Sequence, residues 1–172
     1  MPFDFQPVLR GDLLCLRPLR PDDFGELFTV ASDPLIWEQH PEPDRYTETV
    51  FKQFFHGALA SGGAMLVMDA TDGRVIGSSR FLGYDQARRE IEIGFTFLAR
   101  DYWGGAYNGE MKRLMLRHAF QFVDTVIFLV GPNNIRSQRA LEKIGARRAG
   151  TRVGANGREA LAYEIVRREW LS

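Results

Sequence analysis

Residues 89–123 read REIEIGFTFLARDYWGGAYNGEMKRLMLRHAFQFV and join a strand pattern to a helix pattern through a glycine turn. The segment 89–98 is rich in β-branched and aromatic residues and is expected to form a strand. After Gly104 and Gly105, apolar residues recur at helical spacing. The first amides of a helix have no partner within it and lie at the positive end of its dipole. Since glycine lets an anion approach the backbone, the stretch predicts a phosphate-binding turn.

The glycine pair does not by itself identify a ligand, because a tight turn without any ligand would explain it equally well. Ala106 and Tyr107 occupy the positions where a dinucleotide fingerprint needs its second glycine and spacer. The glycines are not followed by Lys-Ser or Lys-Thr, so the pattern of a P-loop nucleotide site is also a poor match.

The composition is that of one compact domain, which we expect to span residues 1–172. With 22 basic and 22 acidic residues the net charge is zero, so no global field attracts nucleic acid or an anionic membrane. Cys15 is the only cysteine, which excludes an internal disulfide and favours a reducing compartment. Neither a signal peptide nor a membrane-spanning stretch is recognisable, so we expect a cytoplasmic protein.

Strand and helix patterns continue on both sides of the central unit. The further strands are expected at 13–19, 64–69, 74–82, 125–130, 146–153 and 159–166, and the further helices at 22–32, 47–60 and 135–144. We expect the strand at 74–82 to be interrupted at Gly77-Ser78-Ser79. This order predicts an α/β (α+β) domain with antiparallel and parallel parts.

Three motifs, in this order along the chain, resemble the GNAT N-acetyltransferases and, within them, the ribosomal-protein-type subgroup. They are Leu16-Arg17-Pro18-Leu19 with Asp22-Asp23, then Tyr102-Trp103-Gly104-Gly105-Ala106-Tyr107 with Glu110, then the segment from Val130 to Gly145 that contains Asn134 and Ser137. The resemblance covers nearly the whole chain. It implies a mostly antiparallel seven-stranded sheet flanked by helices, with two central strands that splay apart where acetyl-CoA inserts.

The sequence departs from the family pattern at three places. Ala106 replaces the second loop glycine, Asn108-Gly109 stands where a small residue and Thr are usual, and Ala146 replaces a Phe. Many relatives also carry a Tyr in the later helix, where this chain has Leu141.

The resemblance implies which residues bind acetyl-CoA as co-substrate. The backbone amides of the glycine turn would hold the diphosphate, and the end of the central strand would pair with the peptide-like pantetheine arm. Asn134 is expected to cap its helix, to reach the pantetheine, or to do both. The cofactor-binding residues expected in this way are Thr96, Phe97, Leu98, Trp103, Gly104, Gly105, Ala106, Tyr107, Asn134 and Ser137.

Two residues are expected to be catalytic. Glu92 lies in an otherwise apolar strand, where burial would raise its pKa and suit it to act as a general base. The alternative is a solvated Glu92 paired with Arg88 or Arg89. Ser137 matches the family position proposed to protonate the departing thiolate. The less favoured alternative is an ordinary helix-surface residue.

The loop between the first two helices is expected to border the acceptor pocket. Its Trp37, Glu38 and His40 combine an aromatic ring with a carboxylate, which suits a cationic amine. His40 could replace Glu92 as base, or the loop could simply be an exposed loop braced by prolines. No metal site is expected, because no cluster of ligating side chains has metal-ligand spacing.

The function expected from these residues is transfer of an acetyl group from acetyl-CoA to a primary amine, on a small molecule or a protein N-terminus. The alternative is a CoA-binding regulatory or interaction module that has lost turnover, since the helix Tyr is missing. The final strand, residues 161–166, could line a homodimer interface or belong to the core of the sheet.

Overall fold

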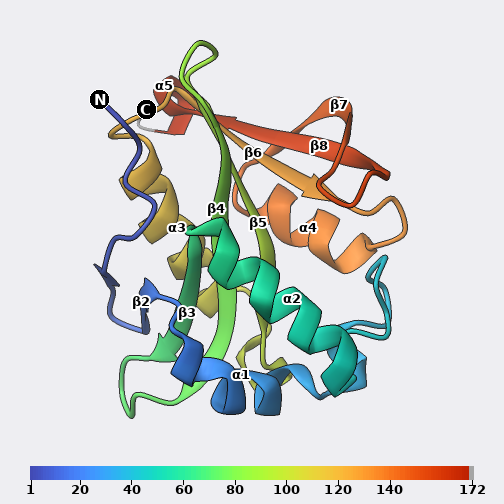
Figure 1. The fold of residues 1–172 in the computed structure, drawn as a ribbon. Coiled ribbons are helices and arrows are strands. Elements are labelled where there is room, and N and C mark those ends of the chain that lie inside the picture. The colour runs from blue at the N-terminus through green and yellow to red at the C-terminus, as the bar shows by residue number, and fades with distance from the viewer. Residues whose placement is uncertain (171–172) are drawn as a thin grey trace.

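Residues 1–170, which a computed structural model describes, form an eight-stranded sheet in the order β1-β2-β3-β4-β5-β6-β8-β7, with helices on both faces (Figure 1). The strands are β1 Leu9–Arg10, β2 Leu14–Pro18, β3 Ala64–Asp69, β4 Val75–Asp85, β5 Glu90–Leu98, β6 Thr125–Val130, β7 Arg147–Val153 and β8 Glu159–Val166. The helices are α1 Phe24–Ala31, α2 Glu48–Ser61, α3 Ala106–Ala119, α4 Ile135–Lys143 and α5 Arg167–Trp170. Three short 3₁₀ turns cover Pro21–Asp23, Pro34–Ile36 and Arg100–Tyr102.

The prediction of a mixed, mostly antiparallel sheet is confirmed, but the number of strands differs by one. Strand β1 has two residues and pairs with β2 through Leu9 opposite Leu16. A segment this short shows no alternation in the sequence, so its pairing with β2 is the only feature that defines it.

Strand β4 runs without the interruption expected at Gly77-Ser78-Ser79, which is a correction. A Cβ on Gly77 would lie 2.0 Å from the carbonyl oxygen of Phe97, so glycine here lets β4 and β5 approach each other. The Ser78 hydroxyl donates to the Met65 carbonyl, and the Ser79 hydroxyl bonds to Thr96 Oγ1. These two polar residues therefore fit inside the buried sheet.

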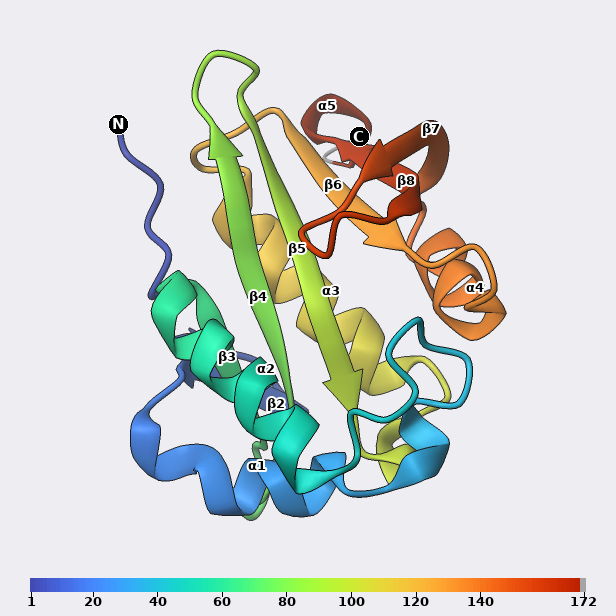
Figure 2. The same ribbon diagram turned by 45° about the vertical axis from the view of Figure 1, so that its right-hand side comes forward.

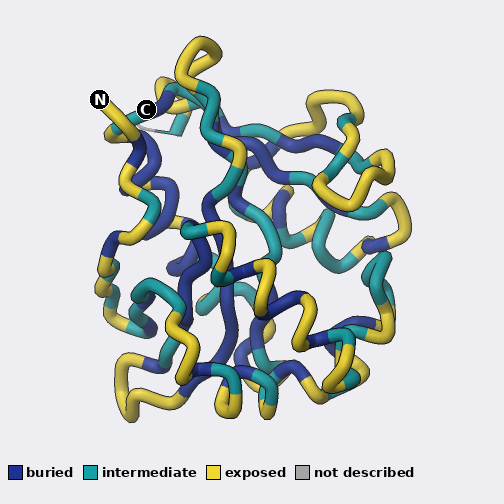
Figure 3. Tube along the Cα trace, viewed as in Figure 1, coloured by how far each residue is buried: buried dark blue, intermediate teal, exposed yellow. Residues whose placement is uncertain are grey.

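Apolar side chains cover both faces of the sheet. On one face, Met111 and Met115 of α3 pack against Ile91 and Ile93 of β5, and Leu141 of α4 joins the same cluster. On the other face, α1 and α2 form a separate cluster with Trp37 and Phe97. Figure 3 shows the central strands buried and the hairpin tips exposed. None of the helices within residues 1–170 is both long enough and apolar enough to span a bilayer.

Glu110, the helix acid of the second motif, attaches α3 to the N-terminal hairpin. It is 6% exposed, and its carboxylate accepts hydrogen bonds from the backbone amides of Asp12, Leu13 and Leu14 at 2.8–3.0 Å. A carboxylate is acceptor-only and has room for several donors. Glu110 therefore has a structural role in this chain.

Two irregularities in β5 create the space for a site. Between Arg80 opposite Gly94 and Ser78 opposite Phe97, β5 carries one extra residue, which is a β-bulge, and Phe95 has a φ of 53°. On its other edge, β5 pairs with β6 in parallel only over Glu90–Glu92. Beyond that point the two strands separate, as expected, and Figure 2 shows them diverging.

Candidate active site

A cavity of about 1210 Å³ opens where β5 and β6 separate. Its lining includes the ends of both strands, the first turns of α3 and α4, the loop 36–45, and residues of the β7–β8 turn and the start of β8 within 154–160. Because α3 and the loop 36–45 pack on opposite faces of the sheet, the cavity passes from one face to the other.

Glu92 lines this cavity at the last position where β5 pairs with β6. Burial raises the pKa of its carboxyl to about 7, opposed by the positive charges of Arg152 and Arg80. The ion pairs of the alternative interpretation do not occur, since Arg88 contacts Glu90 and Arg89 contacts Asp124. A carboxyl that is half protonated at neutral pH and faces a cavity is suited to accept a proton.

The β-bulge of β5 lies in the same cavity wall as Glu92. Phe95 and Thr96 face the single residue Ser79 on β4, so the regular ladder is broken there. Both residues line the cavity, and a strand amide that faces a cavity can donate to an oxygen on which negative charge develops.

Lys112 lies below the bulge, where the sequence gave no reason to expect a functional group. It is 5% exposed, and its Nζ donates to Thr96 Oγ1 at 2.8 Å, which in turn contacts the Ser79 hydroxyl at 2.8 Å. Burial lowers the pKa of Lys112 to about 7. A buried amine thus lies in the cavity wall beside the β-bulge.

The start of α3 forms the end of the cavity where we expect the diphosphate. Gly104 and Gly105 line it with φ values of 116° and 109°, which favour glycine. A Cβ on Gly105 would lie 3.6 Å from Lys143 Nζ, so a lysine of α4 faces the same turn. Arg113 and Arg139 also line the cavity. Free amides, glycines and cations are the groups a CoA diphosphate requires.

Not every residue of the glycine motif faces the cavity. Ala106 and Tyr107 are absent from its lining, and Tyr107 packs edge-on against Tyr102 with ring centroids 4.7 Å apart. Trp103 does line it, with its indole N–H donating to the Leu98 carbonyl and the Arg136 guanidinium 4.0 Å from its ring. Thr96, Phe97 and Leu98 also lie in the wall.

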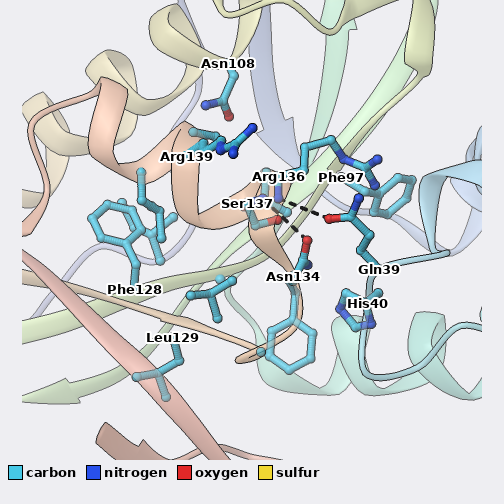
Figure 4. Close-up of a pocket in the computed structure, with 18 of the residues that line it drawn as sticks. Gln39, His40, Phe97, Asn108, Phe128, Leu129, Asn134, Arg136, Ser137 and Arg139 are labelled. Carbon is cyan, nitrogen blue, oxygen red and sulfur yellow. Dashed lines mark hydrogen bonds between the residues drawn. The ribbon is translucent and has the colours of Figure 1, made fainter. Parts of the chain in front are cut away.

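The first turn of α4 brings Asn134 and Ser137 to the cavity (Figure 4). Asn134 caps the helix, because its Oδ1 accepts a hydrogen bond from the Ser137 amide at 3.4 Å. Gln39 of the facing loop accepts from the Arg136 amide at 3.2 Å, which joins the loop to this turn. Leu141, one turn further along, is buried in the wall.

The three residues expected to bind the acceptor lie in different environments. Trp37 is 2% exposed and donates from its indole to the Ala31 carbonyl, so it belongs to the core although its edge reaches the cavity. Glu38 is exposed and lies outside the cavity lining. His40 lines the cavity and packs edge-on against Trp37.

His40 is poorly placed to act as a base. Its Nδ1 accepts a hydrogen bond from the Glu42 amide at 2.9 Å, which assigns the ring proton to Nε2 in the neutral form. Burial, assisted by the positive charge of Arg45, lowers the pKa of His40 to about 4. The only nitrogen lone pair of the neutral ring, on Nδ1, therefore already accepts the hydrogen bond from the Glu42 amide and is not available to take a proton from a substrate.

Several solved structures described as acetyltransferases share this fold. One is a GCN5-related N-acetyltransferase from Brucella melitensis, with a TM-score of 0.82 and 22% identity over 99% of this chain and 83% of that one. Another is a GNAT-family acetyltransferase from Bacillus anthracis, with a TM-score of 0.75 and 22% identity over 93% and 98%. A third is Mycobacterium smegmatis RimJ in complex with CoA-disulfide, with a TM-score of 0.73 and 21% identity over 97% and 89%.

The family itself is shown by the sequence. A sequence model of a protein family, described as an acetyltransferase (GNAT) domain, matches residues 14–147, which is most of the chain. This protein therefore belongs to the GNAT acetyltransferase family, and the resemblance of its motifs to that family is confirmed.

Proposed function

We propose that this protein transfers the acetyl group of acetyl-CoA to a primary amine, with Glu92 as the general base. The observation that carries this proposal is the position of Glu92. It is the last residue of β5 paired with β6, at the point where the sheet opens into the cavity, and burial raises its pKa to about 7.

The residues on the α3–α4 side fit acetyl-CoA. The amides of Gly104 and Gly105, with Lys143 and Arg139 nearby, would hold the diphosphate. Thr96 to Leu98 would pair through their backbone with the pantetheine arm. Bound in this way, acetyl-CoA supplies an activated thioester carbonyl. Ala106 and Tyr107 would support the turn without contacting the ligand.

The residues near the point where β5 and β6 separate would transfer protons and stabilise the charge that develops during the reaction. An ammonium cannot attack a carbonyl, and Glu92 would take its proton before or during attack. The amides of Phe95 and Thr96 at the bulge would stabilise the oxygen on which charge develops. Ser137, whose hydroxyl makes no hydrogen bond within residues 1–170, would donate a proton to the departing thiolate sulfur.

Release of CoA thiol with a set of primary amines tests the proposal directly, with acetylated product identified by mass. The alternative, a binding module without turnover, predicts a normal dissociation constant for acetyl-CoA and no acetylated amine. Glu92→Gln is the matched variant, because it retains the shape of the side chain and loses the base. Transfer by this variant at the wild-type rate would refute the role of Glu92 and leave acetyl transfer itself standing.

A further inference from the structure

Two arginines, Arg45 and Arg80, lie near the point where β5 and β6 separate and have no anionic partner within residues 1–170. Within residues 1–170, neither Arg45 nor Arg80 forms an ion pair or a side-chain hydrogen bond, and the Nε of each is buried without a partner. Arg80 is 8% exposed. A buried charged donor without an acceptor is costly, so such groups in native proteins call for an explanation.

Aromatic rings hold both guanidinium groups in place. The Arg45 guanidinium carbon lies 4.6 Å from the centroid of Phe54 and 5.3 Å from that of Trp37. The Arg80 guanidinium carbon lies 3.9 Å from the centroid of Phe95 and 5.5 Å from that of Phe54. Stacking uses the face of a guanidinium and leaves the N–H groups at its edge free to donate.

These arginines lie on the acceptor side of the cavity. Arg45 and Glu92 both line the cavity. Arg80 is not part of the lining, but its guanidinium stacks on the ring of Phe95, which is. Their aromatic partners belong to the cluster under α1 and α2, on the face opposite α3. The cations expected to hold the CoA phosphates are at the α3 end of the cavity. Arg45 and Arg80 are therefore not expected to bind CoA.

Both arginines remain charged at neutral pH. Burial lowers the pKa of Arg45 to about 10, and burial together with the charge of Arg45 lowers the pKa of Arg80 to about 10. The acidic residues that act on the pair through space are Glu42, Asp44 and Glu92. Glu42 contacts Arg158 at 3.6 Å, and the Glu92 carboxyl is half protonated near pH 7. This wall of the cavity therefore carries net positive charge.

We propose that the acceptor is an amine that also carries an anionic group, a carboxylate or a phosphate, which Arg45 binds while the amine nitrogen faces Glu92. Arg80 supports this site from behind Phe95 through its charge. This inference rests on the proposed function and adds the substrate class. It disfavours polyamines and aminoglycosides, because a purely cationic acceptor would meet two unpaired cations beside the base.

The test compares acceptors that carry the anion with neutral twins that lack it, and kcat/KM is calculated on the concentration of free amine, because removal of the anion also lowers the pKa of the amine. Phenylalanine is paired with phenylalaninamide for the carboxylate, and O-phosphoethanolamine with ethanolamine for the phosphate. For the wild-type protein, kcat/KM for the better anionic acceptor should exceed that of its neutral twin by about 10- to 100-fold, the range expected for a charge-assisted hydrogen bond. The pair with the larger ratio identifies the anion.

Variants then locate the site. Arg45→Met should bring the ratio of the two kcat/KM values close to one and leave the KM for acetyl-CoA within about twofold. Arg10→Gln is the control, since it removes a positive charge from an exposed position far from the cavity lining. Equal loss of activity toward both twins in Arg45→Met would mean a structural role and overturn the proposal.

The wild-type ratios decide the proposal even if Arg45→Met does not fold. Neutral twins that react as well as the anionic ones refute the anion site and leave the acetyltransferase intact. If acetyl-CoA binds but no twin of either pair is acetylated, the result counts against the anion site and the proposed function together.

Discussion

Replacement of Glu92 by glutamine tests the chemistry of the site most directly. The amide has nearly the shape of the carboxyl and cannot accept the proton of an ammonium. A positioned general base contributes roughly 10²- to 10⁴-fold, so kcat/KM for the amine should fall by about that factor. The dissociation constant of acetyl-CoA should change less than about twofold, because its expected anchors, Gly104 and Lys143, lie at the α3–α4 end of the cavity.

The role of Glu92 as a base also predicts how kcat/KM changes with pH. A base works when it is deprotonated, and the pKa of Glu92 is raised to about 7. About one-tenth of the protein has an ionised Glu92 at pH 6 and about nine-tenths at pH 8. Wild-type kcat/KM should therefore rise about tenfold between these values and then level off. The Gln variant depends on the small fraction of free amine, so its rate should keep rising about tenfold per pH unit toward the pKa of the amine.

Stability supplies a check that does not involve activity. A pKa of about 7 in place of 4.5 means that the folded state resists ionisation of Glu92. Below pH 4.5 the carboxyl is protonated in both states and has no effect. As pH rises to 7, the unfolded state loses the proton first, and the folded wild type loses about 3 kcal/mol relative to the Gln variant. Denaturant unfolding at pH 4, 5.5 and 8 measures this difference.

Two results would contradict the reasoning about Glu92. One is a wild-type rate that shows no plateau and follows the free amine at every pH, as the variant should. The other is a wild-type protein that gains stability relative to Glu92→Gln between pH 4.5 and 7, since that would mean a carboxylate stabilised by Arg152 or Arg80 and not a desolvated one.

Three further variants address the remaining parts of the structure. Gly104→Val should raise the dissociation constant of acetyl-CoA by at least about tenfold in calorimetry, because a φ of 116° is strained for a β-branched residue at the phosphate turn; unchanged affinity would remove the turn from the binding site. Glu110→Ala should cost about 3 kcal/mol or more in chemical denaturation, since three backbone amides lose their acceptor, and a loss below about 1 kcal/mol would show that water replaces it. Lys112→Met should raise the unfolding free energy by about 1–4 kcal/mol at pH 7, and the gain should shrink toward pH 10, where the free lysine loses its charge in the unfolded state as well; a gain independent of pH would argue against a desolvated amine.

The sequence predicts regular elements well where one residue pattern dominates. The bounds of β3, β6 and β8 agree with the predicted segments, because each is an apolar or alternating run between turn residues. Helix α5 and strand β1 were missed, since they are too short to show a period. The interruption of β4 was wrongly predicted, because a Gly-Ser-Ser run resembles a turn unless its cross-strand partners are known.

The site was predictable where backbone geometry defines it and much less so where side chains do. Gly104 and Ser137 were found through local motifs, and both line the cavity. Arg45, Arg80 and Lys112 were missed, because an arginine or lysine in a sequence is taken as exposed by default. The burial of Arg80 and Lys112 depends on contacts with other segments of the chain, such as Phe54 against Arg80 and Thr96 against Lys112.

The sequence of the last strand is compatible with a dimer interface or with the core of the sheet. This strand pairs with β6 on one side and β7 on the other, and Tyr163 is 1% exposed. The strand therefore belongs to the sheet, and its apolar residues need no second chain to explain them.

The opening between β5 and β6 has the geometry to pair with a peptide-like ligand. Beyond Glu92, β5 keeps its partner β4 as far as Leu98, and β6 keeps its partner β8 as far as Val130. Each strand is thus paired on its outer edge only, and the two inner edges face the cavity with backbone groups that no neighbouring strand satisfies. An unmet buried backbone group costs about 1–3 kcal/mol, so a ligand with its own amides gains affinity by pairing there. We infer that the same separation that breaks the sheet supplies hydrogen bonds for the pantetheine arm and places its thioester end beside Glu92.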